Sequence, residues 1–279
     1  MTDYFVGIDI GSTMTKVVVM DAGIISSVIG PTGPEQRRLA HRVMETALRQ
    51  AQLPFESITY LVATGYGRIN VPFADKQLTE ISCHARGVTH LYPQTRTLID
   101  VGGQDSKAIK ITDGKPFDFV MNDKCAAGCG RFLDVIADSL GITLEKMDDL
   151  SFQSFSPANV SNLCTVFAEQ EVATKLSEGI PLPDLAAGIL KSLADRIAAM
   201  VKKIKPTREV VMTGGGAKIK GLVSALSKAL GYPLLIPSEP LLTGALGAAL
   251  LGKDMVEKAL KTGVPLGREK RCLKEIKVT

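Results

Sequence analysis

Two closely spaced cysteines in the middle of the chain are the residues with the clearest chemical potential. Cys125 and Cys129 are separated by three residues and accompanied by Gly128 and Gly130, and the apolar segment that follows predicts a helix over residues 130–140. Nucleotide hydrolysis needs no thiol at such a place, whereas thiolates are the usual ligands of iron–sulfur clusters. The segment therefore indicates a metal or iron–sulfur centre.

A third cysteine, Cys164, also directly precedes a predicted helix, over residues 166–177. A cluster held by four thiolates is anionic, and helix N-termini stabilise anions through the macrodipole and their free N–H groups. Cys125 and Cys164 are therefore candidate ligands, although the spacing of Cys125 and Cys129 also suits one shared metal. An isolated cysteine is usually a small core residue, which is the role expected of Cys83 and Cys272. Five cysteines in 279 residues do not suggest a disulfide framework.

Three glycine turns, each directly after a predicted strand, indicate a nucleotide site. Asp9 ends a strand before a turn of small residues, and Asp100 repeats this arrangement in the second half of the chain. Such turns let backbone N–H groups approach phosphate oxygens. The third turn precedes a helix, whose N-terminus favours anions. The candidate binding residues are Gly11, Ser12, Thr13, Met14, Thr15 and Lys16, then Gly102, Gly103 and Gln104, then Gly214, Gly215, Gly216 and Ala217. The Gln104 amide either orients an attacking water or bonds the turn.

The elements that must position these residues occur in two similar series. The first series predicts strands over residues 4–10, 16–20, 24–29 and 57–64 with helices over 35–52 and 81–91. The second predicts strands over 97–101, 106–112, 116–122 and 209–213, with helices over 130–140, 166–177, 183–203, 218–230 and 243–251. We interpret this as a duplication of architecture, not of residue identity, that builds a two-lobed α/β fold.

The predicted lobe I comprises residues 1–94 and is completed by residues 243–279, whereas lobe II comprises residues 95–242. Turn residues cluster at this boundary, near Tyr92 and Pro93. Small residues in the segment 128–130 and in the last helix would let two helices cross closely.

Composition excludes several classes of function. A net charge of +4 and 5% aromatic residues without tryptophan argue against a nucleic-acid partner. The most apolar late segment, residues 241–252, is too short to span a membrane, and no signal peptide is visible, so a cytoplasmic protein is expected. Basic residues gather near the C-terminus, where a solvated surface or a docking surface for an acidic protein is expected: Lys258, Lys261, Arg268, Lys270, Arg271, Lys274 and Lys277.

The three glycine turns, in this order, resemble the actin-like ATPase superfamily of sugar kinases, heat-shock chaperones and actins. The resemblance covers nearly the whole chain. It implies that Asp9 and Asp100 flank a Mg²⁺ ion, that the first two turns hold the phosphates of ATP or ADP, and that residues 214–216 hold the adenosine. In this superfamily a crossing of two helices forms the hinge between the lobes, so the resemblance also implies a hinge at the segment 128–130 and the last helix. The P-loop pattern Gly-x4-Gly-Lys-Ser/Thr does not occur.

Four phrases, residues 62–68, 103–107, 122–133 and 164–169, resemble the activator ATPases of 2-hydroxyacyl-CoA dehydratases. This family includes ATPase subunits of benzoyl-CoA reductases and reductases of double-cubane cluster proteins. The resemblance implies a homodimer whose chains each supply Cys125 and Cys164 to one shared, oxygen-sensitive 4Fe–4S cluster. It also implies ATP-driven transfer of an electron to a partner dehydratase or reductase, with ferredoxin or flavodoxin as donor. Cys129 replaces a small hydroxyl residue of the family, which leaves a second geometry open, with three thiols binding a cluster or zinc within one chain.

Two other classes of function remain as alternatives. A small-molecule kinase of the actin-like superfamily would use the same nucleotide site but would not need the cysteine phrases. A chaperone-like or filament-forming module would need an appended region or insertions, for which 279 residues leave little room. In the favoured hypothesis, lobe closure around ATP moves the helices that begin at the cluster ligands.

Overall fold

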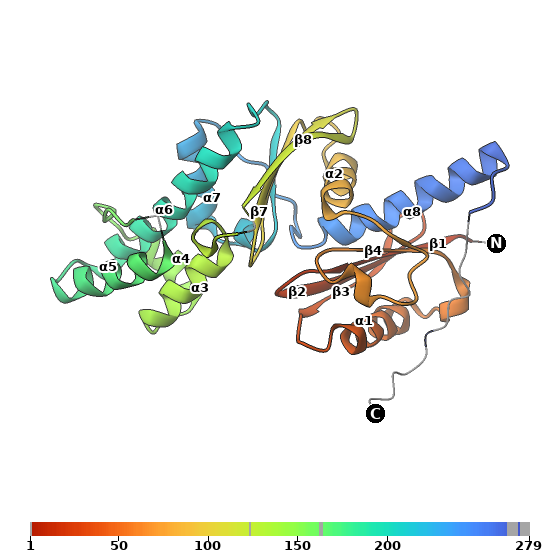
Figure 1. The fold of residues 1–279 in the computed structure, drawn as a ribbon, viewed down its shortest axis with the longest axis horizontal. Helices are drawn as coiled ribbons and strands as arrows, with labels where there is room; N and C mark the ends of the chain where they lie inside the picture. Colours follow the sequence, from red (N-terminus) through yellow and green to blue (C-terminus); the bar gives the residue numbers. More distant parts are fainter. Residues whose placement is uncertain (1, 123, 162–163, 267–272, 274–279) are drawn as a thin grey trace. The chain divides into compact units, whose positions relative to one another are not determined.

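The computed structural model describes residues 2–122, 124–161, 164–266 and 273 (Figure 1). The chain divides into two compact units. Unit 1 comprises Met1–Pro93, Asp113–Pro116 and Leu241–Thr279, and unit 2 comprises Gln94–Thr112 and Phe117–Pro240. No helix among the described residues is long and apolar enough to cross a membrane. Cys272 and five of the late basic residues lie outside the described residues, namely Arg268, Lys270, Arg271, Lys274 and Lys277.

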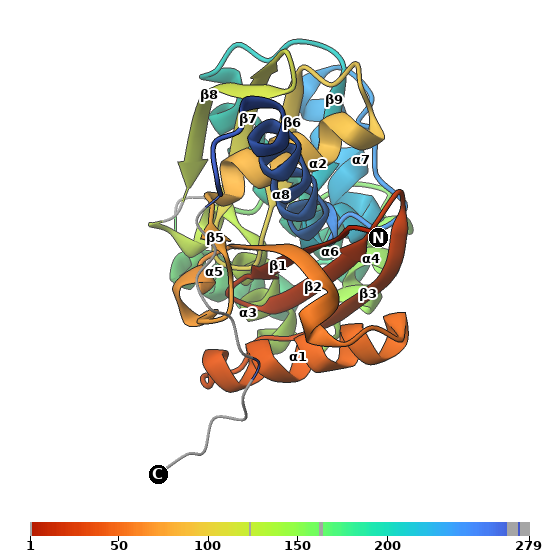
Figure 2. The ribbon, with the colours of Figure 1, turned by 90° about the vertical axis from the view of Figure 1, so that its right-hand side faces the viewer.

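Unit 1 is built on a five-stranded sheet with the order β3-β2-β1-β4-β5. Its strands are β1 (Tyr4–Ile10), β2 (Met14–Met20), β3 (Ile24–Pro31), β4 (Ile58–Thr64) and β5 (Lys76–Gln77). β1 pairs antiparallel with β2 and parallel with β4. α1 (Gln36–Ala51) covers one face of the sheet, and α8 (Thr243–Thr262) and α2 (Glu80–Leu91) lie on the other (Figure 2).

The two faces of this sheet follow the alternation of side chains along β1. Val6, Ile8 and Ile10 belong to the buried cluster that includes α1, whereas Phe5 belongs to the cluster that includes α8. Alternate residues of a strand point to opposite faces, so a strand covered on both sides is apolar throughout. This pattern explains why β1 is recognisable from the sequence.

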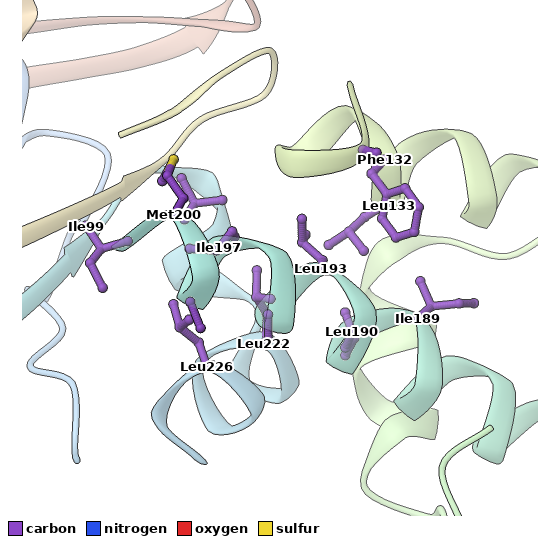
Figure 3. Packing of buried hydrophobic residues seen from close by; sticks show 14 of the residues in the cluster. Ile99, Phe132, Leu133, Ile189, Leu190, Leu193, Ile197, Met200, Leu222 and Leu226 are labelled. Atoms are coloured by element: carbon purple, nitrogen blue, oxygen red, sulfur yellow. The ribbon is translucent and has the colours of Figure 1, made fainter. Parts of the chain in front are cut away.

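Unit 2 contains a four-stranded sheet with the order β8-β7-β6-β9. Its strands are β6 (Thr97–Val101), β7 (Ser106–Thr112), β8 (Lys115–Asn122) and β9 (Val210–Thr213). Its helices are α3 (Gly130–Ser139), α4 (Leu144–Ser151), α5 (Thr165–Ser177), α6 (Leu182–Lys202) and α7 (Lys220–Leu230). Figure 3 shows Leu193 of α6 lying between Leu133 of α3 and Leu222 of α7, and these residues belong to one buried cluster.

Most predicted elements are confirmed to within two residues, whereas the two-residue strand β5 was not predicted and two helices differ from the prediction. α4 was not predicted, because its eight residues carry only two buried side chains, Met147 and Leu150. The last helix was expected to end at residue 251 but continues to Thr262, where Gly263 adopts φ +68°. Its second half is mainly polar, so the apolar pattern ended before the helix did.

The small residues of α8 are explained by packing inside unit 1. A side chain at Gly247 would collide with the backbone of Cys83 on α2, and one at Gly7 on β1 would collide with Ala245 on α8. Glycine and alanine therefore let α8 lie directly against both α2 and β1. A crossing of α8 with the segment 128–130 stays a prediction.

The predicted duplication of architecture is confirmed, since each sheet contains the order third, second, first, fourth strand of its series. Within this duplicated architecture, one pair of residues does occupy matching positions in the two halves. Asp9 faces Lys16 across β1 and β2, and Asp100 faces Lys107 across β6 and β7. Both pairs span seven residues along the chain, and the strand register shows that the two members of each pair face each other.

Candidate nucleotide and thiol sites

The first carboxylate turn lies in unit 1, between β1 and β2. Asp9 is 3% exposed, and its Oδ2 lies 3.1 Å from Lys16 Nζ. Gly11 N–H donates to the Met14 carbonyl at 3.1 Å and closes the turn. Beyond it, Thr13 O accepts from Thr32 N–H at 2.8 Å, and the Thr15 hydroxyl lies 2.8 Å from that of Thr32. Ser12 and Thr13 lie on the turn itself, so the predicted residues 9–16 form one continuous structure.

The second carboxylate turn lies in unit 2, between β6 and β7, and repeats this geometry. Gly102 N–H donates to the Asp105 carbonyl at 2.9 Å. Asp100 is buried, and its Oδ2 lies 3.7 Å from Lys107 Nζ, which lies 2.7 Å from Asp105 Oδ1. Gly103 and Gln104 lie at the bend, with Gln104 exposed. A buried lysine between two carboxylates retains its charge only through such pairing.

A Thr-Gly-x-Gly turn stands beside each aspartate. Asp9 pairs in parallel register with Thr64, and Asp100 with Thr213. The glycines that follow, Gly65 and Gly214, have φ values of +86° and +81°. A side chain on either glycine would meet the neighbouring aspartate and the backbone after it. These glycines therefore allow each turn to close over its carboxylate.

The predicted adenosine turn is the second of these Thr-Gly-x-Gly turns. Gly214 N–H donates to Pro240 O at 3.1 Å, while Gly216 and Ala217 are buried. Gly215 is exposed, and a side chain there would meet nothing within 4 Å. Open space at this glycine is compatible with a nucleoside lying against the backbone.

Two backbone N–H groups at the N-terminus of α7 already have hydrogen-bond partners within the protein. Asp148 of α4 accepts from Lys220 N–H at 3.0 Å and from Gly221 N–H at 2.6 Å. A carboxylate is a favourable cap for a helix N-terminus. Asp148 thus takes up two of the N–H groups that the sequence suggested for an anionic ligand.

The two candidate cluster ligands are similar to each other and differ from the other two cysteines that the structure describes. Cys125 and Cys164 are free, half-buried cysteines that directly precede a 3₁₀ turn (Ala126–Gly128) and α5. Neither side chain caps its helix. Two accessible thiols at helix starts suit thiolate ligands of an anionic cluster. One chain supplies two such thiols, which is half of the four that a 4Fe–4S cluster needs.

Cys129 and Cys83 are buried thiols. Burial raises the pKa of Cys129, whose Sγ lies 3.3 Å from the Ala126 carbonyl as a hydrogen-bond donor. Burial also raises the pKa of Cys83, to about 12, and its place in the core confirms the expected structural role. Among the described residues, no group of three or more His, Cys, Asp or Glu could hold a metal ion.

Sequence reasoning missed three residues of these sites. Lys107, Thr213 and Gly65 lie beside the aspartates, and Thr213 Oγ1 donates to Asp100 Oδ1 at 2.8 Å. The signal was present as a repeated spacing, Asp-x-Gly followed by Lys seven residues after Asp, and as two Thr-Gly-x-Gly phrases. Without the strand pairing, these repeated patterns did not indicate which residues lie beside the aspartates.

Comparison with known proteins decides the family. Residues 6–252 match the model of the BadF/BadG/BcrA/BcrD ATPase family. The chain belongs to this ATPase family. A solved activator of 2-hydroxyisocaproyl-CoA dehydratase from Clostridium difficile with bound ADPNP has 42% identity and a TM-score of 0.87, over 95% of this chain and 99% of that one.

Two further relatives of this ATPase are similar over almost their whole length. The activator of lactoyl-CoA dehydratase from Anaerotignum propionicum is 43% identical over 91% of this chain and 99% of its own length. The solved component A of (R)-2-hydroxyglutaryl-CoA dehydratase from Acidaminococcus fermentans has 38% identity and a TM-score of 0.89, over 92% of this chain and 100% of that one. The expected family and the actin-like fold are thereby confirmed.

Proposed function

We propose that this ATPase is an iron–sulfur activator that passes a low-potential electron to a partner of the 2-hydroxyacyl-CoA dehydratase type. The observation that carries the proposal is the pairing of two features in one chain. Duplicated carboxylate–glycine turns suit a nucleotide, and two accessible helix-start thiols, Cys125 and Cys164, suit a shared cluster. The relatives named as dehydratase activators support the same function.

In this proposal the nucleotide is bound by the three turns, residues 9–16, 100–104 and 214–217. Asp9 and Asp100 would hold Mg²⁺, directly or through water, since buried carboxylates suit a hard cation. Mg²⁺ would supply charge neutralisation for the phosphates. Lys16, whose side chain is 12% exposed, would contact a phosphate oxygen, and Gln104 would orient the attacking water.

The thiol site implies a homodimer. Cys125 and Cys164 of two chains would give four thiolates around one oxygen-sensitive 4Fe–4S cluster, whereas the buried, protonated Cys129 would stay outside the ligand set. The cluster would supply one low-potential electron, and ferredoxin or flavodoxin would be the donor. A cytoplasmic location suits such a site, since thiols there stay reduced.

The decisive experiment is anaerobic purification with iron and sulfide analysis of the wild type and of Cys125→Ser, Cys164→Ser and Cys83→Ala. We expect four iron atoms per dimer in the wild type and in Cys83→Ala, and loss of iron in both serine variants. Iron that survives both serine substitutions would contradict the proposed ligands. One iron centre per monomer would support the three-thiol geometry instead.

The partner is tested separately, by ATP-dependent reduction of purified candidate enzymes. A 2-hydroxyacyl-CoA dehydratase is expected to be reduced and activated. Selective reduction of a double-cubane protein or of a benzoyl-CoA reductase would favour these alternative partners. ADP production stimulated by a sugar or carboxylate, with no electron transfer, would favour a kinase.

A further inference from the structure

The N-terminus of α3 is capped by the second phosphate turn instead of by a side chain. Gly130 N–H donates to the Gly102 carbonyl at 2.8 Å, and Arg131 N–H donates to the Gly103 carbonyl at 2.7 Å. The N-cap residue Cys129 contributes no side-chain cap. The first N–H groups of a helix have no partner within the helix, so the turn satisfies two of them.

The same peptide units carry the N–H groups that face the other way. The Gly102 carbonyl shares a planar peptide with Gly103 N–H, and the Gly103 carbonyl shares one with Gln104 N–H. In a trans peptide the N–H and C=O point in opposite directions. With α3 bound at the carbonyls, the two N–H groups are therefore aimed away from α3, and they are the predicted phosphate donors.

On its other side, the start of α3 is tied to Cys125 by a short chain of hydrogen bonds. Phe132 N–H donates to Cys129 O, Cys129 N–H to Ala126 O, and Gly128 N–H to Cys125 O. Asn122 Nδ2 also holds Cys125 O, at 2.7 Å. The segment from residue 125 to α3 is therefore one hydrogen-bonded unit.

We propose that the two peptide planes at Gly102–Gly103 and Gly103–Gln104 are the link between nucleotide and thiol sites, with Gly130 as its positioning residue. A phosphate that accepts from the N–H side polarises each peptide and strengthens its carbonyl as an acceptor for α3. Loss of that phosphate weakens the hydrogen bonds from Gly130 and Arg131 to the turn, and the segment that carries Cys125 is then held less tightly. This inference rests on the proposed function and names the route by which nucleotide state reaches Cys125.

Gly130→Ala breaks this link with little other disturbance. A methyl group there would lie 3.0 Å from the Gly102 carbonyl oxygen and 3.3 Å from Gly103 Cα, so the start of α3 has to shift by a few tenths of an ångström relative to the two carbonyls, which weakens their hydrogen bonds. Alanine otherwise favours a helix. Gly252→Ala in α8 is the matched control, since its methyl would lie 3.2 Å from the Val62 side chain on β4 and would not touch this turn.

The test measures iron release to a chelator from the anaerobic, cluster-loaded protein with ADP or a non-hydrolysable ATP analogue. Couplings between sites commonly correspond to about 5- to 150-fold, and a ratio in this range is expected for wild type and Gly252→Ala. The ratio should fall to about one in Gly130→Ala, with nucleotide affinity retained. If the iron-release ratio of Gly130→Ala equals that of the wild type, only the proposed link is overturned. If iron release from the wild type does not depend on the nucleotide, the proposed function is overturned as well.

Amide exchange on the wild-type protein tests the link even if Gly130→Ala fails to fold. The amides of Gly130 and Arg131 are expected to exchange more slowly with the ATP analogue than without nucleotide, because their acceptors become stronger. Unchanged exchange at both amides under saturating nucleotide overturns the proposal.

Discussion

The two carboxylate turns contain the same aspartate, lysine and threonine at matching positions, but these residues have different contacts in the two units. Within the described part of the chain, Lys16 pairs with Asp9 alone and keeps some exposure, whereas the buried Lys107 lies between Asp100 and Asp105. Thr213 donates to Asp100, whereas its counterpart Thr64 donates to the Leu78 carbonyl. One copy is thus bound into its own polar network, and the other leaves its lysine closer to solvent.

The position between the two glycines of each Thr-Gly-x-Gly turn also differs. Gly215 leaves open space in unit 2, whereas unit 1 carries Tyr66, which is 73% exposed. In the proposed function, the nucleoside therefore lies against the Thr-Gly-x-Gly turn of unit 2 and not against that of unit 1. Divergence at single positions, with the backbone retained, is enough to divide the tasks between two halves.

The largest expected difference between the two copies is in the stability effect of their lysines. Lys107→Ala should lower the free energy of unfolding by about 3–5 kcal/mol, because two carboxylates lose a buried partner. Lys16→Ala should cost less and mainly reduce ATP hydrolysis. Chemical denaturation of both variants checks this, and equal losses of stability would remove the proposed asymmetry.

The two threonines beside the aspartates should also differ in their effect on stability, with the larger loss again in unit 2, but by less than the two lysines. Thr213→Val removes a buried hydrogen bond to a charged group, which is worth about 1.5–3 kcal/mol. Thr64→Val removes a bond to a carbonyl, worth about 0.5–1.5 kcal/mol. Thermal unfolding of the pair is the measurement, and a greater loss in Thr64→Val would contradict the interpretation.

Nucleotide affinity should separate Gly215 from Tyr66. Gly215→Tyr should weaken ATP binding at least about tenfold, or about 1.4 kcal/mol, with unchanged stability, because the side chain fills open space. Tyr66→Gly should leave the affinity unchanged. Titration of a fluorescent nucleotide decides between these outcomes, and equal effects would place the nucleoside elsewhere.

The smallest expected effect is a difference in thiol reactivity, which separates the half-buried cysteines from the buried Cys83. In cluster-free protein at pH 8, Cys125 and Cys164 should react with a thiol reagent, whereas Cys83 should not. The pKa of Cys83 is raised to about 12 by burial, so it stays a protonated thiol well above pH 8, and the reagent needs the thiolate. Mass spectrometry of labelled peptides checks this, with urea-unfolded protein as the control in which Cys83 reacts.

Local pattern was enough to predict most of the fold. Alternating or continuous apolar runs identified β1, β6 and β7, and apolar spacing identified α1 and α6, because burial leaves a period in the sequence. The short α4 and the polar second half of α8 were missed for the same reason, since few of their residues are buried. Glycine turns after strands indicated the nucleotide residues because backbone approach to phosphate requires small residues.

What the sequence by itself determined is therefore the order of the elements, the glycine turns and the distinctive phrases around Cys125 and Cys164. Only the tertiary structure decided which residues meet: Lys107 with Asp100 across a strand pair, Thr213 with Asp100 from 113 residues away, and α3 with the carbonyls of the second turn. It also separated the half-buried Cys125 from the buried Cys129. Such contacts depend on strand register and helix docking, which arise from packing of distant segments and leave no local period in the chain.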